Sequence, residues 1–213
     1  MSHVIVLGGG LAGLAAAERL CEGGCRVTVV EQDNVLGGLA KSFLLDGKWI
    51  PVTYHHVMLP DRMTQEYMKK LGLWEDAEWC TSPQAFWYDG KEYLLSQPRH
   101  IFRFAPLSFR SKLRLLRFGM FCWLKTDWHD LDGVDCESWL TDKLGREIVE
   151  VLFRHLFDIK FKIPMSAISM AWLGQRLHQS VRNRDRYGCP RGGVERLVSG
   201  LAQSVRRRGG TIL

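Results

Sequence analysis

The sequence predicts an α/β protein in which a parallel-sheet domain carries an inserted, mainly helical region. A β-branched run, a glycine-rich turn and an apolar helical pattern follow one another in the first 30 residues. The chain returns to a helix and a strand near its C-terminus, and helical periodicity dominates the stretch between. We therefore expect three regions, at residues 1–60, 61–185 and 186–213.

Composition places few limits on the type of protein. The chain has 213 residues, of which 46% are hydrophobic and 24% charged, and its net charge is +6. These values are ordinary for a globular protein, and the positive balance permits an anionic partner. The six cysteines include no C-x-x-C pair of a zinc or redox site. Scattered free thiols without a recognisable signal peptide are expected in a reducing cytoplasm. No apolar run approaches the roughly 18–20 residues that span a bilayer, so we expect a cytoplasmic protein.

The N-terminal segment combines a strand, a glycine turn and a helix. His3–Leu7 has the continuous apolar pattern of a fully buried strand. In the turn that follows, Gly8 suits a tight bend, Gly10 lets the backbone approach a diphosphate, and Gly13 lets the helix pack closely on the sheet. The helix that begins at Leu11-Ala12 would present free N–H groups and a positive dipole end to phosphate oxygens.

An acid stands at the end of the second predicted strand. Arg26–Val30 leads to Glu31, which lies 18 residues after Gly13. A carboxylate at this position can accept hydrogen bonds from both ribose hydroxyls of an adenosine and would repel a 2′-phosphate. Strand, glycines, helix and acid together predict a Rossmann-like dinucleotide-binding domain. The alternative is that the glycines serve only tight packing in another α/β unit.

A second glycine pair, Gly37-Gly38, follows Glu31. With it the segment resembles the FAD-binding N-terminus of the flavin amine oxidase, protoporphyrinogen oxidase and phytoene desaturase superfamily. In that group a second glycine-rich turn passes beside the FAD diphosphate, so the resemblance implies FAD as the cofactor. Relatives usually continue Gly-Gly-Arg, where this chain has Leu39. We expect Lys41 and Ser42 to supply the cationic and hydroxyl contacts instead.

Two further segments resemble flavin-side elements of the same superfamily. Relatives carry a Gly-Gly-His or His-His element where this chain has His55-His56, and a Pro-x-Gly-Gly turn where it has Gly192-Gly193. These four residues are candidates for the flavin or substrate side. The alternative for the histidines is a buried turn with one satisfied imidazole; a metal site would need a third ligand nearby. We expect no metal, and no catalytic residue is assigned.

Local signals predict the elements of the middle region. Asp61 can cap a helix to Leu71, and Asp89-Gly90 suits the type I′ turn of a hairpin. Ser108 can cap a long helix from Phe109 to about Lys125. Further helices are expected at 135–144, 146–158 and 166–178. In the resembled superfamily such a helical cap covers the flavin and forms much of the substrate site.

The stretch 99–125 is strongly basic. Between Tyr93 and Thr126 there is no acid, and the seven bases are Arg99, Arg103, Arg110, Lys112, Arg114, Arg117 and Lys125. A basic amphipathic helix can contact an anionic membrane surface peripherally or meet an acidic substrate, and it can also be a solvated face. No nucleic-acid-binding module accompanies the charge, so we expect no nucleic acid partner.

The resemblance implies an FAD-dependent oxidoreductase that passes hydride from a substrate C–H to flavin N5. The aromatic-rich middle region favours a large hydrophobic substrate; packing within the cap is the alternative explanation for the same residues. Because the resembled enzymes are much longer, the chain is expected to be truncated at its C-terminus. Alternatives are a non-redox flavoenzyme similar to UDP-galactopyranose mutase, and a non-catalytic remnant that binds FAD or a partner. A partner chain that supplies the missing C-terminal half is also open.

Overall fold

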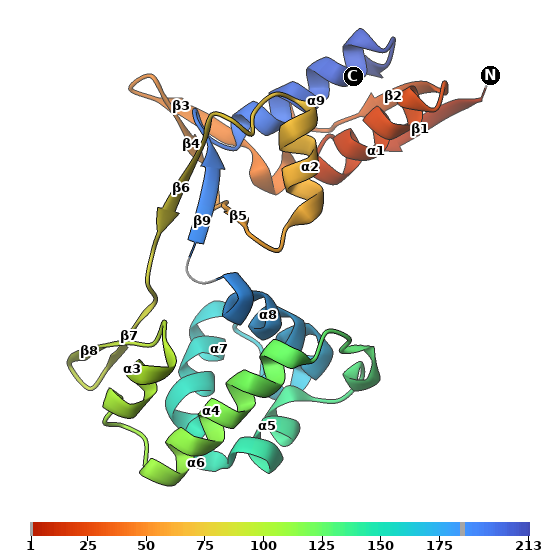
Figure 1. Cartoon of the computed structure of the whole chain (residues 1–213). Coiled ribbons are helices and arrows are strands. Elements are labelled where there is room, and N and C mark those ends of the chain that lie inside the picture. Colours follow the sequence, from red (N-terminus) through yellow and green to blue (C-terminus); the bar gives the residue numbers. More distant parts are fainter. Residues whose placement is uncertain (1, 184–185) are drawn as a thin grey trace. The chain divides into compact units, whose positions relative to one another are not determined.

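The chain folds into two units, each with its own core. The structure, a computed structural model, describes residues 2–183 and 186–213. The first unit joins the chain up to Cys80 with Tyr187–Leu213, and the second is Thr81–Arg186 (Figure 1). Residues 61–80, which the sequence analysis grouped with the helical region, belong to the first unit because Met68 and Leu73 are buried in its core.

A three-stranded parallel sheet forms the base of the first unit. Its strand order is β1 (His3–Leu7), β2 (Arg26–Val30) and β10 (Thr211–Ile212). Helices α1 (Leu11–Glu22) and α9 (Glu195–Arg207) lie side by side in Figure 1 and contact each other. The segments at the two ends of the sequence therefore build one α/β layer, as the sequence predicts.

The expectation that β1 is fully buried is wrong for the described part of the chain. Ile5 and Leu7 are 60% and 83% exposed, whereas the alternate residues Val4 and Val6 are partly covered. Side chains of a strand alternate between the two faces of a sheet. Among the described residues, only the face toward α1 is packed, which leaves Ile5 and Leu7 in contact with solvent.

The rest of the first unit consists of short strands and one helix. In chain order these are the 3₁₀ turn Gly38–Ala40, β3 (Ser42–Leu45), β4 (Lys48–Pro51), β5 (Val57–Met58), α2 (Arg62–Lys70), β6 (Ala77–Thr81) and β9 (Arg186–Pro190). Strands β3 and β4 form an antiparallel hairpin, and the second sheet has the order β5-β9-β6. Asp61 stands at the N-cap of α2 as expected, but its carboxylate accepts the N–H of Met58 instead of capping the helix.

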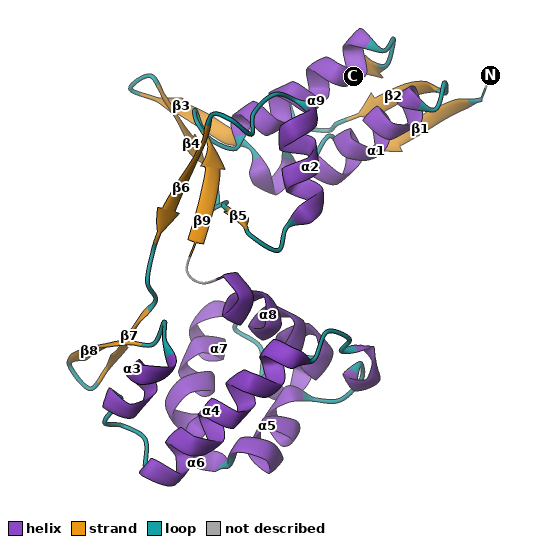
Figure 2. Cartoon of the chain, in the orientation of Figure 1, coloured by secondary structure: helices purple, strands orange, loops and turns teal. Residues whose placement is uncertain are grey.

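The second unit is mainly helical (Figure 2). It begins with the expected hairpin, in which Asp89 and Gly90 both have positive φ. Its elements are β7 (Ala85–Tyr88), β8 (Lys91–Leu94), α3 (Pro98–Arg103), α4 (Phe109–Leu124), α5 (Cys136–Leu144), α6 (Arg146–Ile148), the π-helical segment Val149–Arg154, α7 (His155–Lys160) and α8 (Met170–Asn183). Ser108 caps α4 by accepting the N–H of Ser111, which confirms the predicted start.

Two helices of this unit differ from the sequence prediction. The helix expected at 146–158 is interrupted by the π-helical segment and extends to Lys160. The helix expected at 166–178 is α8, which begins later because the hydroxyl of Ser169 accepts the N–H of Ala171 and starts the helix there. In the part of the chain that the structure describes, no helix is long and apolar enough to cross a membrane.

Candidate dinucleotide-binding site

The turn between β1 and α1 is closed by glycine. Gly8 has φ +100°, and its N–H donates to the carbonyl of Val30 over 2.7 Å. A Cβ on Gly13 would lie 1.9 Å from the carbonyl oxygen of Gly8, closer than any real contact. Residue 13 therefore has to be glycine for the first turn of α1 to pack on the strand end, which is the geometry the sequence analysis expected.

The N-terminus of α1 offers a place for an anion. Gly10 is the N-cap residue, no side chain caps the helix, and no acid stands in its first turn. The N–H groups of Leu11, Ala12 and Gly13 have no acceptor within the helix, because first-turn donors never do. Together with the helix dipole they form a site suited to phosphate oxygens.

Glu31 lies beside this turn. Its carboxylate accepts the N–H groups of Asp33 and Gly9. These two hydrogen bonds lower the pKa of Glu31, so the group is ionised at neutral pH. A carboxylate offers about four acceptor positions, which leaves capacity for the hydroxyls of a ribose.

The second glycine turn contacts the first. The N–H of Gly37 donates to the carbonyl of Gly9 over 2.9 Å, and Gly10 and Gly37 form an isolated parallel bridge. Gly37 and Gly38 have φ +113° and +57°, the left-handed region that glycine adopts without strain. The structure therefore brings the two glycine motifs together at the end of β1.

Lys41 and Ser42 follow the second turn but differ in their contacts. The ammonium of Lys41 pairs with Asp33 over 2.6 Å, and this hydrogen bond raises the pKa of Lys41. Its charge is thus partly compensated, which weakens it as a cation for a diphosphate. Ser42 is buried, and its hydroxyl has no hydrogen-bond partner among the described residues. A buried polar group without a partner is costly, so this hydroxyl is available to a ligand.

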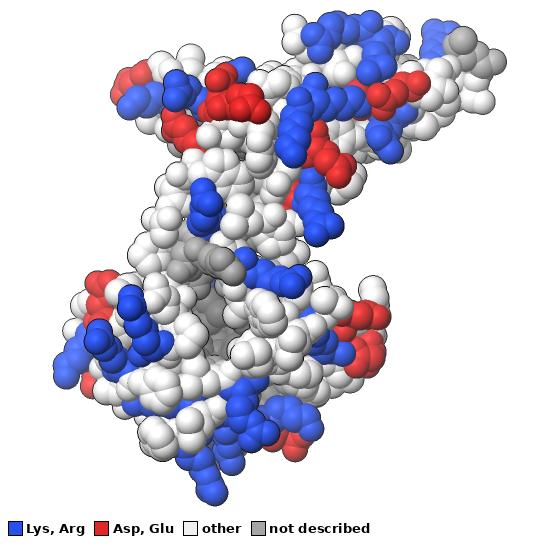
Figure 3. Space-filling view, viewed as in Figure 1, with Lys and Arg blue, Asp and Glu red and all other residues white. Residues whose placement is uncertain are grey.

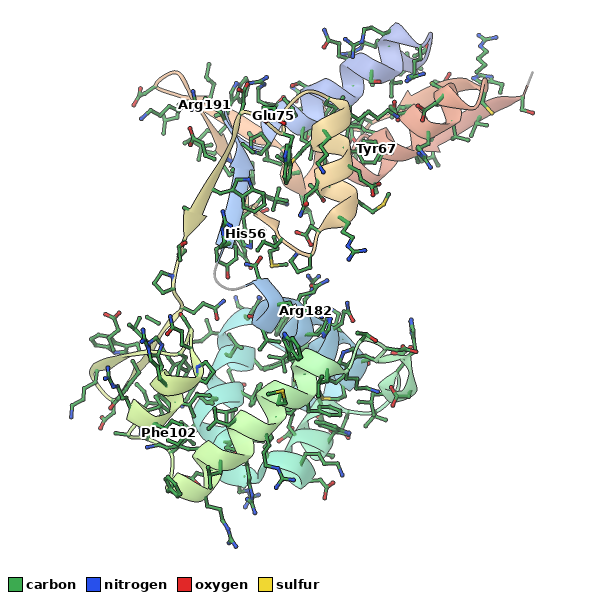
Figure 4. All side chains as sticks on the ribbon, in the orientation of Figure 1. His56, Tyr67, Glu75, Phe102, Arg182 and Arg191 are labelled. Atoms are coloured by element: carbon green, nitrogen blue, oxygen red, sulfur yellow. The ribbon has the colours of Figure 1, made fainter. Side chains whose placement is uncertain are left out.

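The two histidines lie at a small cavity of about 100 Å³ in the same unit. The ring of His56, labelled in Figure 4, packs edge-on against Tyr187 with centroids 4.5 Å apart. Loss of solvent lowers the pKa of His56. Nδ1 of His55 lies 2.9 Å from the carbonyl oxygen of Thr53. The cavity is lined by Leu11, His55, His56, Val57, Thr64, Gly188, Cys189, Pro190, Val194 and Leu197.

This cavity joins motifs that are far apart in sequence. It places the start of α1, the histidine pair and the segment before the Pro-x-Gly-Gly turn around one space. Gly192 and Gly193 do not line it: with φ +88° and +87° they form the bend from β9 into α9. A Cβ on Gly193 would lie 3.5 Å from the carbonyl oxygen of Trp49, so this bend lies next to β4.

Thr64 and Tyr187 are neighbours of the histidines that the sequence does not predict. Thr64 is on α2 and Tyr187 on β9, and both reach the histidines only through tertiary packing. No local pattern identifies such contacts. Among the described residues, no group of three or more His, Cys, Asp and Glu side chains is arranged to hold a metal ion.

The residues present fit a dinucleotide that carries a diphosphate. Glycines at the two turns leave room for a diphosphate next to the backbone, and no side chain caps the helix N-terminus. Glu31 is ionised, and the hydroxyl of Ser42 has no hydrogen-bond partner among the described residues. The sequence model of the family described as flavin-containing amine oxidoreductases matches residues 11–213, nearly the whole chain. The chain belongs to this family. This membership supports FAD as the cofactor and confirms the family that the sequence motifs resemble.

The individual relatives and solved structures are longer than this chain. L-amino acid oxidase Lm29 of Lachesis muta is 36% identical over 73 residues, which are 33% of this chain and 14% of that protein. Wild-type putrescine oxidase bound to putrescine superposes with a TM-score of 0.66 at 18% identity, over 99% of this chain and 51% of that one. Reduced UDP-galactopyranose mutase superposes with a TM-score of 0.68 at 19% identity, over 100% of this chain and 48% of that one. The chain thus spans about half the length of these solved structures, and at such identities they show the fold alone.

Proposed function

We propose that this chain is the FAD-binding and cap-forming part of an FAD-dependent oxidoreductase that moves hydride from a substrate C–H to flavin N5. The observation that carries the proposal is the contact between the two glycine turns beside an ionised Glu31. Family membership supports the oxidoreductase class, and the aromatic residues of the helical unit favour a large hydrophobic substrate.

Each group of the site would hold a different part of the cofactor. The first-turn N–H groups of α1 would receive the diphosphate, and Glu31 would accept the ribose hydroxyls. Ser42 would donate its unpartnered hydroxyl beside the second turn. When bound, FAD supplies the hydride acceptor, and the protein contributes orientation and exclusion of water. His55 and His56 would lie on the flavin or substrate side.

Titration of the purified chain with FAD tests the binding half of this proposal. Glu31→Ala should weaken FAD binding about tenfold or more, because a charge-assisted hydrogen bond contributes about 1.5–3 kcal/mol. Glu66→Ala is the matched control: Glu66 is exposed on α2 of the same unit, and its side chain makes no hydrogen bond or ion pair with the described residues. Its FAD affinity should equal that of the wild type.

Other results would favour the alternatives. A folded chain that ignores added FAD would support a remnant, or a site that a partner chain completes. If FAD binds, the reaction class is tested by flavin bleaching under anaerobic conditions with candidate hydrophobic amines or polyenes. Turnover of a UDP-sugar that requires reduced flavin, without net oxidation, would replace the oxidoreductase by a mutase-like enzyme.

A further inference from the structure

The helical unit contains a second site, an apolar cavity of about 560 Å³. This volume is typical of small-molecule sites, which are mostly apolar with a few polar groups. The cavity lies between α3, α4, the end of α8 and the segment that precedes α3. Its walls are Gln84, Leu95, Ser96, Gln97, Pro98, Ile101, Leu115, Leu116, Gly119, Met120, Trp123, Ser180 and Val181.

Helix α4 turns one face to the core and another to this cavity. Ser111, Phe118 and Cys122 are buried in the unit, whereas Met120 and Trp123 on the cavity side are 58% and 46% exposed. Gly119 lies between these faces, and a Cβ added to it would meet nothing within 4 Å. Glycine in the middle of a helix costs stability relative to alanine. Here it leaves open space in the wall of the cavity.

Two arginines lie next to lining residues of this uncharged cavity, Arg182 in space and Arg99 in sequence. Among the described residues no acid or base lines the cavity. The guanidinium of Arg182, labelled in Figure 4, lies 5.7 Å from the ring centroid of the lining residue Trp123. Arg99 follows the lining residue Pro98 in the sequence. In the described part of the chain neither arginine makes an ion pair. Lys and Arg also gather on the lower part of this unit in Figure 3, whereas Arg182 lies at its upper end in Figure 4.

We propose that this cavity binds an anionic amphiphile, with the apolar chain inside and the carboxylate or phosphate head at Arg182. The apolar walls match the chain. The guanidinium of Arg182 over Trp123, which makes no ion pair with the described residues, matches the head. The site involves only the helical unit, so it does not depend on the proposed redox function.

Displacement of a fluorescent fatty acid, dansylaminoundecanoate, by monomeric oleate tests the site on the full chain. Gly119→Phe fills the cavity from its wall and should weaken binding of the probe at least about tenfold, the effect of displacing two methylene groups. Gly119→Ala is the matched control, because one methyl group meets open space there and should leave binding within about twofold. Far-UV circular dichroism verifies that both variants are folded.

The role of charge is tested separately. Arg182→Gln should weaken the binding of oleate but not that of its methyl ester. Arg117 on α4 lines a different cavity, so Arg117→Gln should change the binding of neither ligand. Sedimentation with phosphatidylglycerol vesicles distinguishes membrane lipid from the free amphiphile as the source. Vesicle binding that Gly119→Phe abolishes supports the cavity as a lipid site. Failure of the wild type to bind the probe, or unchanged binding by Gly119→Phe, refutes the proposal.

Discussion

At the residue scale, the buried hydroxyl of Ser42 and that of Ser204 have opposite surroundings. Ser204 donates to the carboxylate of Glu18 over 3.2 Å, whereas the hydroxyl of Ser42 has no partner among the described residues. A buried polar group without a partner costs about 1–3 kcal/mol. A residue kept at that cost, next to a glycine turn, is expected to serve a ligand.

Ser42→Ala should therefore separate stability from binding. Without FAD, the free energy of unfolding should stay the same or rise by about 1 kcal/mol, because the unsatisfied hydroxyl is removed. With FAD, affinity should fall about three- to tenfold, the loss of one ordinary hydrogen bond. Urea unfolding and FAD titration measure the two effects. The control Ser204→Ala should lower stability and leave FAD affinity unchanged. Loss of stability in Ser42→Ala would mean that the Ser42 hydroxyl serves the fold instead of the cofactor.

At the scale of elements, one buried acid connects three helices. Glu18 on α1 is 1% exposed and pairs with Lys70 of α2 over 2.8 Å and with Arg208, just after α9, over 3.4 Å. Both partners are also near Glu22, so they stay partly compensated when Glu18 is changed. The network fixes α2 and α9 on α1, and thereby the helix whose N-terminus forms the candidate phosphate site.

Glu18→Gln should destabilise the first unit by about 2–3 kcal/mol, somewhat below the usual loss when one partner of a buried ion pair is removed. Glu22→Gln is the control, because Glu22 is 39% exposed and its solvent-screened pairs with Lys70 and Arg208 should contribute clearly less than those of Glu18. Chemical unfolding monitored by circular dichroism measures both. Equal losses for the two variants would mean that burial of Glu18 adds nothing.

The start of α4 depends on a carboxylate from α6. Glu147 accepts the hydroxyl of Ser111 over 2.6 Å and both the N–H and the hydroxyl of Ser108. These bonds, that of Ser111 first, lower the pKa of Glu147 below its usual value of 4.5. A lowered pKa in the folded state gives stability that is present above pH 4.5 and is lost as the pH falls through the folded-state pKa.

Glu147→Gln should thus destabilise the helical unit by about 1 kcal/mol at neutral pH, and the difference from the wild type should shrink as the pH falls below 4.5. Glu150→Gln provides the matched control: it loses only an exposed i,i+4 pair with Arg154, which solvent screens, and should change stability less than Glu147→Gln. Thermal unfolding across a pH series measures this. A difference that stays constant down to pH 3 would contradict the assigned role of the charge.

Elements with a local signal were predictable from sequence, and those made by distant segments were not. The Asp89-Gly90 hairpin and the Ser108 cap depend on residues within one turn, and both appear where expected. The sheet β5-β9-β6 joins strands more than 100 residues apart. The sequence of Val57–Met58 alone does not predict its pairing with β9. The cavity at His55 and His56 depends on that pairing. Both glycine motifs could be found in the sequence, but their mutual contact could not.

At the scale of the whole molecule, the two units have separate hydrophobic cores. Phe104, Phe157 and Met170 belong to the core of the helical unit, and Leu14, Met68 and Leu201 to that of the first unit. All candidate FAD-binding residues lie in the first unit. Units with separate cores can unfold separately, so calorimetry of the 213-residue chain should resolve two transitions.

FAD should then raise the melting temperature of only one transition. A ligand that binds a folded unit stabilises it by RT ln(1 + [L]/Kd), about 2.7 kcal/mol at 100 times Kd. We expect this shift in the transition of the first unit and none in that of the helical unit, because the cofactor-binding groups are all in the former. Glu31→Ala should remove most of the shift, and oleate should move the other transition instead. A shift of both transitions by FAD would mean that the helical unit also contributes to the cofactor site, and the assignment of FAD to the first unit alone would then be wrong.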